Sequence, residues 1–229
     1  MATKSDRNGA RASSGLALVL SGGGARGAYQ VGVLKGLLAL GLGGSGESPF
    51  QILVGSSAGS INAAMLAAHA DRFEDGVAAL DRLWSKIRAN QVFRTDVASL
   101  GGIGLKWVRD LTFGGVLGHV APKALLDTAP LRKLLAKNIP FARIDANVVG
   151  GALRALAISA TNLYTTNGVV FVHGSSEVPL WKRIRRHVER TEIGVEHLMA
   201  SSAIPVFFPS VEIDGRHFGD GCIRNTAPL

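Results

Sequence analysis

The stretch Leu16-Ala-Leu-Val-Leu-Ser-Gly-Gly-Gly-Ala-Arg-Gly27 decides the fold of this chain. Five apolar residues end at a polar, glycine-rich loop, which is typical of a short buried parallel strand. Apolar residues at helical spacing follow over residues 28–40, and Gly41 is placed to end that helix. The order of strand, glycine loop and helix repeats at residues 51–54 and 60–70. This alternation predicts an α/β fold with a parallel sheet and helices packed on it.

The rest of the chain continues the pattern as one domain. We expect a flexible tail over residues 1–14 and a single domain over residues 15–229. A helix start signal at residues 225–229 is followed by no helix, which predicts that the domain is truncated at its C-terminus. The glycine-rich apolar residues 100–120 predict either a mobile flap over a substrate or an irregular buried connection. The remaining predicted elements are helices at 74–87, 130–137 (capped by Asp127 or Thr128) and 193–200, strands at 153–159 and 169–173, and a hairpin at 211–218 that turns at Asp214-Gly215.

Charge limits the class of partner. The 229 residues carry a formal net charge of +8, which favours a lipid surface or nucleic acid. The sequence has no zinc-finger spacing and no basic region interleaved with stacking aromatics, so nucleic acid is not supported. Residues 181–190 place Trp181, Ile184 and Val188 on one side of a predicted helix, among basic residues. Such a helix suits an anionic membrane surface, and a solvated helix face is the alternative.

The cysteine content and the absence of a leader signal bear on the cellular location that we expect. Cys222 is the only cysteine in the sequence, which excludes an internal disulfide and makes a structural zinc cluster unexpected. The histidines show no metal-ligand spacing, so no metal is expected. The apolar run at residues 16–20 is too short for a signal-peptide core or a membrane span. We expect a cytoplasmic protein or one peripheral at a membrane surface, and the sequence makes no prediction of its oligomeric state.

The segment Gly55-Ser56-Ser57-Ala58-Gly59 matches the nucleophile elbow G-x-S-x-G. A strand that turns sharply into a helix leaves no room for side chains two positions either side of the central residue, so both flanks are glycine. Ser57 would then project at the helix N-terminus, where the Ala58 amide and the helix dipole face any oxyanion on a substrate. A glycine-rich turn with incidental serines is the alternative.

The glycine loop has two interpretations. Gly22-x-Gly24-x-x-Gly27 matches the dinucleotide fingerprint G-x-G-x-x-G and lies between a strand and a helix. A dinucleotide site also needs an acidic residue at the end of the second strand to bind the ribose. The nearest acid, Glu47, precedes that strand, and the strand ends in the serine elbow instead. We therefore interpret the loop as a nest of backbone donors that stabilises the oxyanion of acyl transfer.

A serine nucleophile needs a base. Asp214 and His217 could complete a triad with Ser57, but Asp214 stands at the predicted hairpin turn. Asp220-Gly221 follows the hairpin, where the end of a strand places a carboxylate at the rim of the sheet. An ordinary turn aspartate is the alternative for Asp220.

In combination, these residues resemble the patatin-like phospholipase family of lipid acyl hydrolases, which use a Ser–Asp dyad. The resemblance covers residues 15–229 and rests on three motifs in the right order: Gly22-Gly-Gly-Ala-Arg-Gly27, Gly55-Ser-Ser-Ala-Gly59 and Asp220-Gly221. It implies a three-layer α/β sandwich with a mostly parallel central sheet flanked by helices. It also implies a lipid or other acyl ester as substrate and no cofactor.

Carried over position by position, the resemblance implies that Ser57 is the nucleophile and Asp220 the proton acceptor of a covalent acyl-enzyme mechanism. Cys222 departs from the glycine or alanine usual in the family, and we expect a mild effect on the dyad from this small residue. A non-catalytic lipid-binding protein and a dinucleotide-binding oxidoreductase are the alternatives. The implied site comprises the oxyanion loop Gly22, Gly23, Gly24, Ala25, Arg26 and Gly27, the elbow residues Gly55, Ser56, Ala58 and Gly59, and the dyad-motif residues Gly221 and Cys222.

Overall fold

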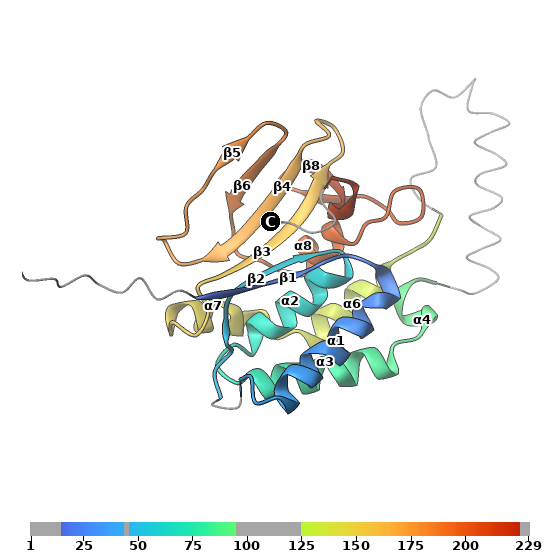
Figure 1. Ribbon diagram of the computed structural model, residues 1–229. Helices are drawn as coiled ribbons and strands as arrows, with labels where there is room; N and C mark the ends of the chain where they lie inside the picture. Colours follow the sequence, from blue (N-terminus) through green and yellow to red (C-terminus); the bar gives the residue numbers. More distant parts are fainter. Residues whose placement is uncertain (1–14, 44–45, 95–124, 225–229) are drawn as a thin grey trace, which may run out of the picture.

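The computed structural model describes residues 15–43, 46–94 and 125–224 (Figure 1). The strands are β1 (Leu16–Leu20), β2 (Phe50–Ser56), β3 (Ala155–Asn162), β4 (Gly168–Gly174), β5 (Lys182–Arg183), β6 (Arg186–Arg190), β7 (Val211–Ile213) and β8 (Arg216–Asp220). The helices are α1 (Gly27–Ala39), α2 (Ala58–Ala68), α3 (Phe73–Lys86), α4 (Ala89–Val92), α6 (Ala129–Asn138), α7 (Ala142–Val149) and α8 (Val195–Ser201), with short 3₁₀ helices η1 (Gly24–Arg26) and η2 (Gly221–Ile223).

Three sequence expectations lie outside the described residues. These are the tail at 1–14, the flap or buried connection at 100–120, and the helix start signal at 225–229.

The predicted alternation at the start of the chain is confirmed. β1 and β2 pair in parallel, with Leu18 opposite Leu53, and α1 connects them. The helix ends as predicted at Gly41, which has a φ of 87° and donates its amide to the Leu38 carbonyl at 2.9 Å. Leu42 donates to the Leu37 carbonyl at 3.0 Å, which completes a Schellman motif.

β3 is the centre of the sheet. It pairs in parallel with β2, with Ser159 opposite Ser56, and antiparallel with β4 along its other edge. β2 ends at Ser56, and β8 then pairs antiparallel with the edge that β2 leaves free, so that Asp220 lies opposite Ala160. The strand order is β1-β2-β3-β4-β6-β5, with β7 beside β8. The predicted α/β fold with parallel strands at its start and flanking helices is therefore confirmed.

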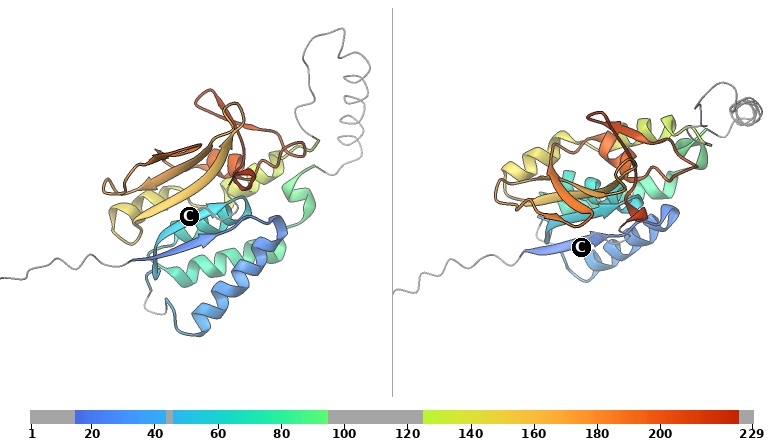
Figure 2. Two further views of the ribbon diagram at one scale, coloured as in Figure 1. Left: turned by 45° about the horizontal axis from the view of Figure 1, so that its top comes forward. Right: turned by 90° about the horizontal axis from the view of Figure 1, so that it is seen from above.

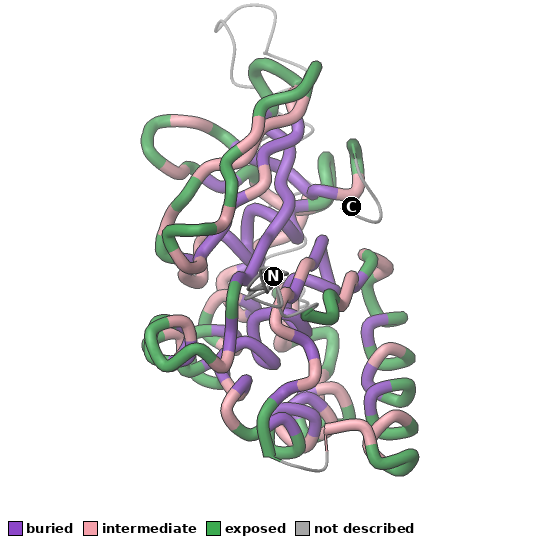
Figure 3. The backbone as a smooth tube through the Cα atoms, turned by 60° about the vertical axis from the view of Figure 1, so that its left-hand side comes forward, coloured by how far each residue is buried: buried purple, intermediate pink, exposed green. Residues whose placement is uncertain are grey.

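The main hydrophobic core lies between the helices and one face of the sheet. Figures 1 and 2 show α1, α2 and α3 together on one side of β1, β2 and β3. All eight residues of β3 and all eleven of α2 are buried. Figure 3 shows the outer helices alternating between buried and exposed positions within each turn, as amphipathic helices do at the edge of a core.

The opposite face of the sheet carries a second, smaller cluster. Ala155, Ala157 and Val172 are buried there, and Val54 and Val188 pack against them. No helix among the described residues contributes to this cluster, so the described part of the chain supplies two layers of the expected three-layer sandwich.

The prediction of a helix at residues 181–190 is wrong. These residues form the β5–β6 hairpin, which turns at Arg185 with a φ of 59°. β6 pairs in parallel with β4, from Arg186 opposite Gly168 to Arg190 opposite Val172. The helical spacing of Trp181, Ile184 and Val188 was overridden by this pairing along the edge of β4.

The other predicted turns and caps are borne out. The β7–β8 hairpin turns at Asp214-Gly215, where φ is 49° and 70°, as a type I′ turn requires. Of the two predicted caps of α6, Asp127 makes the side-chain bond, accepting the Ala129 amide at 2.8 Å, whereas Thr128 makes none.

Arg216 on β8 and Glu189 on β6 form a bidentate ion pair at 2.6 and 2.7 Å. Hydrogen bonds from Arg216 lower the pKa of Glu189, against the opposing effect of burial. A lowered pKa in the folded state means that the pair stabilises the fold above the unfolded-state pKa of about 4.3. That stability is lost as the pH falls through the lower folded-state pKa.

We expect Glu189→Gln to lower the free energy of unfolding by about 1 kcal/mol at neutral pH, because the pair is partly exposed. The difference from wild type should shrink toward zero at acidic pH, where Glu189 of the wild type is neutral in both the folded and the unfolded state. Urea unfolding at the two pH values measures it, with Glu212→Gln on β7 as a matched exposed control. A difference that is independent of pH would contradict the ion-pair account.

Candidate active site

Ser57 stands between β2 and α2, at the carboxyl end of the parallel strands. Its backbone has a φ of 52° and a ψ of −125°, a conformation that residues other than glycine rarely adopt. The side chain is 6% exposed, and it lies at the N-terminus of α2, where the helix dipole is positive. The strand, sharp turn and helix predicted for the elbow are therefore present.

The two elbow glycines lie against backbone. A Cβ at Gly59 would overlap the Leu20 carbonyl oxygen at the end of β1, and a Cβ at Gly55 would lie 2.5 Å from the Gly59 carbonyl oxygen. Both contacts are closer than any real side chain allows. Glycine at the two positions therefore lets α2 pack directly on the ends of β1 and β2.

The backbone of Ser57 is held from α8. The Ser57 amide donates to the Ser201 hydroxyl at 2.9 Å, and Ser201 is fully buried. On the carbonyl side, Ser60 donates to the Ser57 carbonyl through its amide and its hydroxyl, at 2.9 and 2.6 Å. These bonds satisfy both backbone polar groups of Ser57 and hold the turn in its strained conformation.

The glycine loop borders Ser57 with unpaired backbone donors. Gly24 has a φ of 56°, which suits glycine, and starts the 3₁₀ turn that leads into α1. In the described part of the chain, the amides of Gly23, Gly24 and Ala58 donate to no other group. Such orphan amides at helix N-termini are available to an anion.

Three side chains fix the glycine loop to the elbow. Asn62 on α2 is fully buried and donates to the Gly27 carbonyl at 3.0 Å and to Gln30 Oε1 at 2.9 Å. Trp84 on α3 donates its indole N–H to Asn62 Oδ1 at 2.7 Å. Gln30 in turn donates to the Ser21 carbonyl at 2.8 Å. This network sets the distance between the start of α1 and the start of α2.

The six loop residues predicted from the sequence have different surroundings. Gly24 and Ala25 line the cavity above Ser57. Gly27 is buried where a Cβ would press on the Trp84 ring, and Arg26 is exposed with its guanidinium folded over Gly23. A Cβ at Gly22 would overlap Cys222 Sγ and lie 3.0 Å from Ser57 Cβ, so Gly22 separates these two residues.

β3 brings Asp220 to the end of β2. Ser56 and Asp220 pair with Ser159 and Ala160, which are consecutive residues of β3. A Cβ at Gly221 would meet Ser56 Oγ at 2.7 Å, so the Asp220-Gly221 turn touches the residue next to Ser57. Asp220 is 5% exposed, and its Oδ1 accepts the Cys222 amide at 2.7 Å. No hydrogen bond joins Ser57 Oγ to the Asp220 carboxylate among the described residues.

Cys222 lies at the junction of the three motifs. Its thiol is 3.3 Å from Ser56 Oγ, and its amide donates to Asp220 Oδ1 at 2.7 Å. Burial raises the pKa of this thiol, and the neighbouring Asp220 charge raises it further. Cys222 is therefore a neutral thiol beside the Asp220 carboxylate, and its effect on the dyad stays a prediction.

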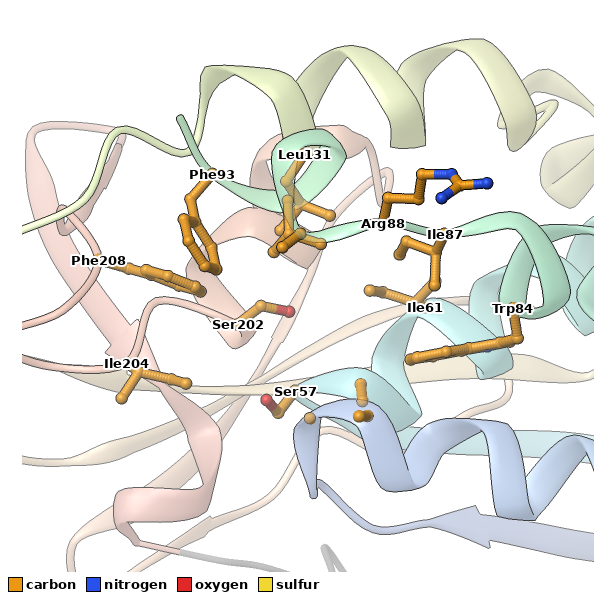
Figure 4. A pocket seen from close by; sticks show the side chains of 15 residues that line it. Ser57, Ile61, Trp84, Ile87, Arg88, Phe93, Leu131, Ser202, Ile204 and Phe208 are labelled. Carbon is orange, nitrogen blue, oxygen red and sulfur yellow. The ribbon is translucent and has the colours of Figure 1, made fainter. Parts of the chain in front are cut away.

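A cavity of about 370 Å³ opens above Ser57 (Figure 4). This volume is in the range of small-molecule sites. Ser57 lies at one end of the cavity, below Ser202, and the surrounding walls are mostly apolar. Asp220 and Cys222 do not line it. Its large apolar side chains are Ile61, Trp84, Ile87, Phe93, Leu131, Ile204 and Phe208.

The alternative triad is not assembled. Asp214 occupies the hairpin turn, and His217 contacts the Ser210 hydroxyl through Nδ1 at 3.4 Å. Among the described residues, no histidine lines the cavity at Ser57. Within the described ranges, no group of three or more His, Cys, Asp or Glu could hold a metal ion.

Sequence reasoning missed Ser201, Ser202 and Asn62. Ser201 and Ser202 end a helix that carries no motif, and 144 positions separate Ser201 from Ser57. Asn62 lies three residues past the elbow, and nothing local shows that it bridges three helices. For Asn62 alone a signal existed, since a polar residue in an otherwise apolar helix needs a buried partner.

Comparison with known proteins matches residues 18–229 to the family model of the patatin-like phospholipases. Among solved structures, the chain resembles VipD from Legionella pneumophila, with a TM-score of 0.53 and 18% sequence identity. That match covers 93% of this chain and 47% of the VipD chain, so this chain spans about half the length of that protein. At this identity the likeness concerns the fold. A search of curated proteins found no match.

We expect Ser201→Ala to destabilise the protein by about 1–3 kcal/mol, because it leaves the buried Ser57 amide without an acceptor. The neighbouring Ser202→Ala is the matched control. Ser202 Oγ is buried without a hydrogen-bond partner in the described structure, so its removal should cost nothing or stabilise. Urea unfolding of the two variants measures the difference, and equal effects would contradict the assignment.

Proposed function

Because the chain belongs to the patatin-like phospholipase family, whose members act on lipids, we propose that it is a serine lipid acyl hydrolase. Its substrate in this proposal is a fatty acyl ester of a phospholipid or lysophospholipid. The acyl chain enters the cavity between α2, α3 and the loop after α8, and the ester carbonyl lies over Ser57. No cofactor takes part in the proposed reaction.

The proposed reaction has two steps. Ser57 Oγ attacks the ester carbonyl carbon while Asp220 accepts the hydroxyl proton, and the leaving alcohol takes that proton as the C–O bond breaks. A water molecule then attacks the acyl-enzyme, giving a proton to Asp220, which returns it to Ser57 Oγ as the fatty acid leaves. In each step the tetrahedral oxyanion accepts hydrogen bonds from the amides of Gly23, Gly24 and Ala58.

The observation that carries the proposal is the position of Ser57. It combines a strained backbone, a helix N-terminus, neighbouring unpaired amides and an apolar cavity of sufficient volume. The Ser57 amide itself is already bonded to Ser201, so the oxyanion donors must come from the glycine loop and Ala58. The proximity of Asp220 along β3 supports its role as proton acceptor, because active-site hydrogen bonds often tighten only when substrate binds.

The oxidoreductase alternative has less support. The Gly22 amide already donates to Cys222, and Gly27 is packed against Trp84. These contacts occupy part of the loop that a pyrophosphate would need, and the second strand ends in the elbow and not in an acidic residue.

We expect purified wild-type protein to release fatty acid from phospholipid vesicles without added metal, and a chelator to leave the rate unchanged. Ser57→Ala should lower turnover by about 10³-fold or more, and Asp220→Asn by about 10²–10⁴-fold. Mass spectrometry after acid quenching should detect an acyl adduct on Ser57. Circular dichroism of both variants controls for folding.

Two outcomes would overturn this proposal. Activity that survives Ser57→Ala would exclude the mechanism. A folded wild type that binds vesicles and releases no fatty acid would favour the non-catalytic lipid-binding alternative.

We expect Cys222→Ala to raise turnover about three- to ten-fold, because it removes a polar thiol next to Asp220 that would compete with Ser57 for the carboxylate. Cys222→Ser is the matched control, since its hydroxyl keeps a donor toward Asp220 and should not raise the rate. Steady-state kinetics on a soluble ester measures both. Turnover that falls in Cys222→Ala would show that the thiol supports the site.

A further inference from the structure

Two β-turns lie side by side at one end of the sheet. Residues 163–167 connect β3 to β4, and Ile184 and Arg185 connect β5 to β6. The Gly168 amide donates to the Arg185 carbonyl at 2.9 Å, which joins the two turns (Figure 1). Tyr164 and Ile184 occupy the turns, and each is 93% exposed. An aromatic and an aliphatic side chain are thus exposed to water on adjacent turns.

The first turn is rigid. Asn162 Oδ1 accepts the amides of Tyr164 and Thr165 at 3.0 and 2.9 Å. From the other side, Arg224 donates to the Thr166 carbonyl at 2.7 Å and to its hydroxyl at 3.0 Å. Tyr164 is therefore held outward by fixed backbone and is not simply exposed on a loose loop.

The β5–β6 turn is strongly cationic. Lys182, Arg183 and Arg185 are exposed on the β5–β6 hairpin. Residues 162–168 and 178–188 contain no aspartate or glutamate. The next carboxylate along β6, Glu189, is already paired with Arg216. The surface around Tyr164 and Ile184 therefore presents uncompensated positive charge.

The two turns lie at the same end of the sheet as Ser57 and project beyond it. β3 continues three residues past Ser159, the residue opposite Ser56, which corresponds to about 10 Å. Leu163 begins the turn and packs against β8, where a Cβ at Gly219 would meet Leu163 Cδ2 at 2.8 Å and the Ala203 carbonyl oxygen at 3.4 Å. The turn thus adjoins the segment after α8.

That segment continues the apolar surface to the cavity. Ile204 and Phe208 line the cavity at Ser57, and Val206 and Phe207 between them are exposed. The backbone here is fixed by bonds from the Leu125 and Leu126 amides to the Val206 and Phe207 carbonyls, at 2.9 and 2.8 Å. Exposed apolar side chains therefore lie both on the two turns and on the segment that lines the cavity.

We propose that the two turns and this segment form a docking surface for an anionic lipid bilayer. Its apolar residues are Leu163, Tyr164, Ile184, Val206 and Phe207, and its cations are Lys182, Arg183 and Arg185. Docking places the apolar side chains at headgroup depth, where tyrosine is favoured, and pairs the cations with anionic headgroups. The proposal rests on the proposed function, because it orients the cavity mouth toward the membrane that holds the substrate.

The two kinds of side chain favour a bilayer over nucleic acid. The phosphates of a nucleic acid could pair with the cations. An exposed aliphatic side chain such as Ile184, however, gains no favourable contact from a solvated phosphate backbone. A bilayer interface satisfies the cations and the apolar residues together. No helix in the described part of the chain could span a membrane, so any attachment through these residues is made at the surface.

The test uses the full chain carrying Ser57→Ala, so that binding is measured without hydrolysis. Co-sedimentation is measured with vesicles of phosphatidylcholine alone and of phosphatidylcholine mixed with phosphatidylserine. We expect clear preference for the anionic vesicles. Removing the three cations together (Lys182→Gln, Arg183→Gln, Arg185→Gln) should weaken that binding about 100-fold, at about five-fold per cation. Tyr164→Ser with Ile184→Ser should weaken binding to both vesicles roughly ten-fold.

Matched variants elsewhere on the surface control for general charge and hydrophobicity. Lys86→Gln, Lys133→Gln and Lys137→Gln together remove the same charge from α3 and α6. Leu40→Ser with Val149→Ser removes two exposed apolar side chains from the opposite end of α1 and from α7. Neither control should change vesicle binding by more than about two-fold, and thermal unfolding confirms that all variants are folded.

Three results would overturn the docking surface. One is equal weakening by the turn variants and by their controls. Another is wild-type binding to neutral and anionic vesicles alike, without dependence on the turns. The third is tight binding of a DNA or RNA oligonucleotide through the three cations with no vesicle binding. Since hydrolysis plays no part in these measurements, they are independent of whether the proposed acyl hydrolase activity is found.

Discussion

The backbone pairing along one edge of β3 is the constraint on which the rest of this structure depends. β2 uses the first part of that edge and β8 uses the part beyond it, so the ends of two distant strands meet. Ser56 and Cys222, 166 positions apart, come into contact only because of this arrangement. A slip of one residue in either pairing would turn the strand over and remove its last side chains from the junction. The register of β3 therefore determines the geometry at Ser57.

Close approach at this junction depends on the absence of side chains. Gly22, Gly55, Gly59 and Gly221 each face a neighbour so close that a Cβ could not be accommodated without movement. The loop after β1, the elbow and the turn after β8 can therefore share one small volume. Cys222 is the exception, since a thiol stands in that volume and makes contacts with both Ser56 and Asp220. The site is compact because these segments approach one another closely at positions that carry no side chain.

The sequence predicted what local chemistry determines. The strand, loop and helix units at the start of the chain, the elbow glycines and the Asp214-Gly215 turn all follow from steric rules that act within a few residues. The β5–β6 hairpin did not follow, because pairing with β4 outweighed a helical spacing that the same residues also show. Ser201 could not be found from sequence, since its bond to the Ser57 amide depends on how α8 packs. The contact of Cys222 with Ser56 could not be found from sequence either, because it depends on distant segments meeting.

The end of α8 and the residues just after it are bonded to both Ser57 and Asp220. Ser201 Oγ accepts the Ser57 amide, and the Ala203 carbonyl accepts the Asp220 amide at 2.8 Å. The next residue, Ile204, already belongs to the cavity wall. Whatever fills the cavity and shifts that wall therefore moves the attachment points of Ser57 and Asp220 together. The cavity wall and the backbone of both residues are thus joined through one short stretch of chain, residues 201–204.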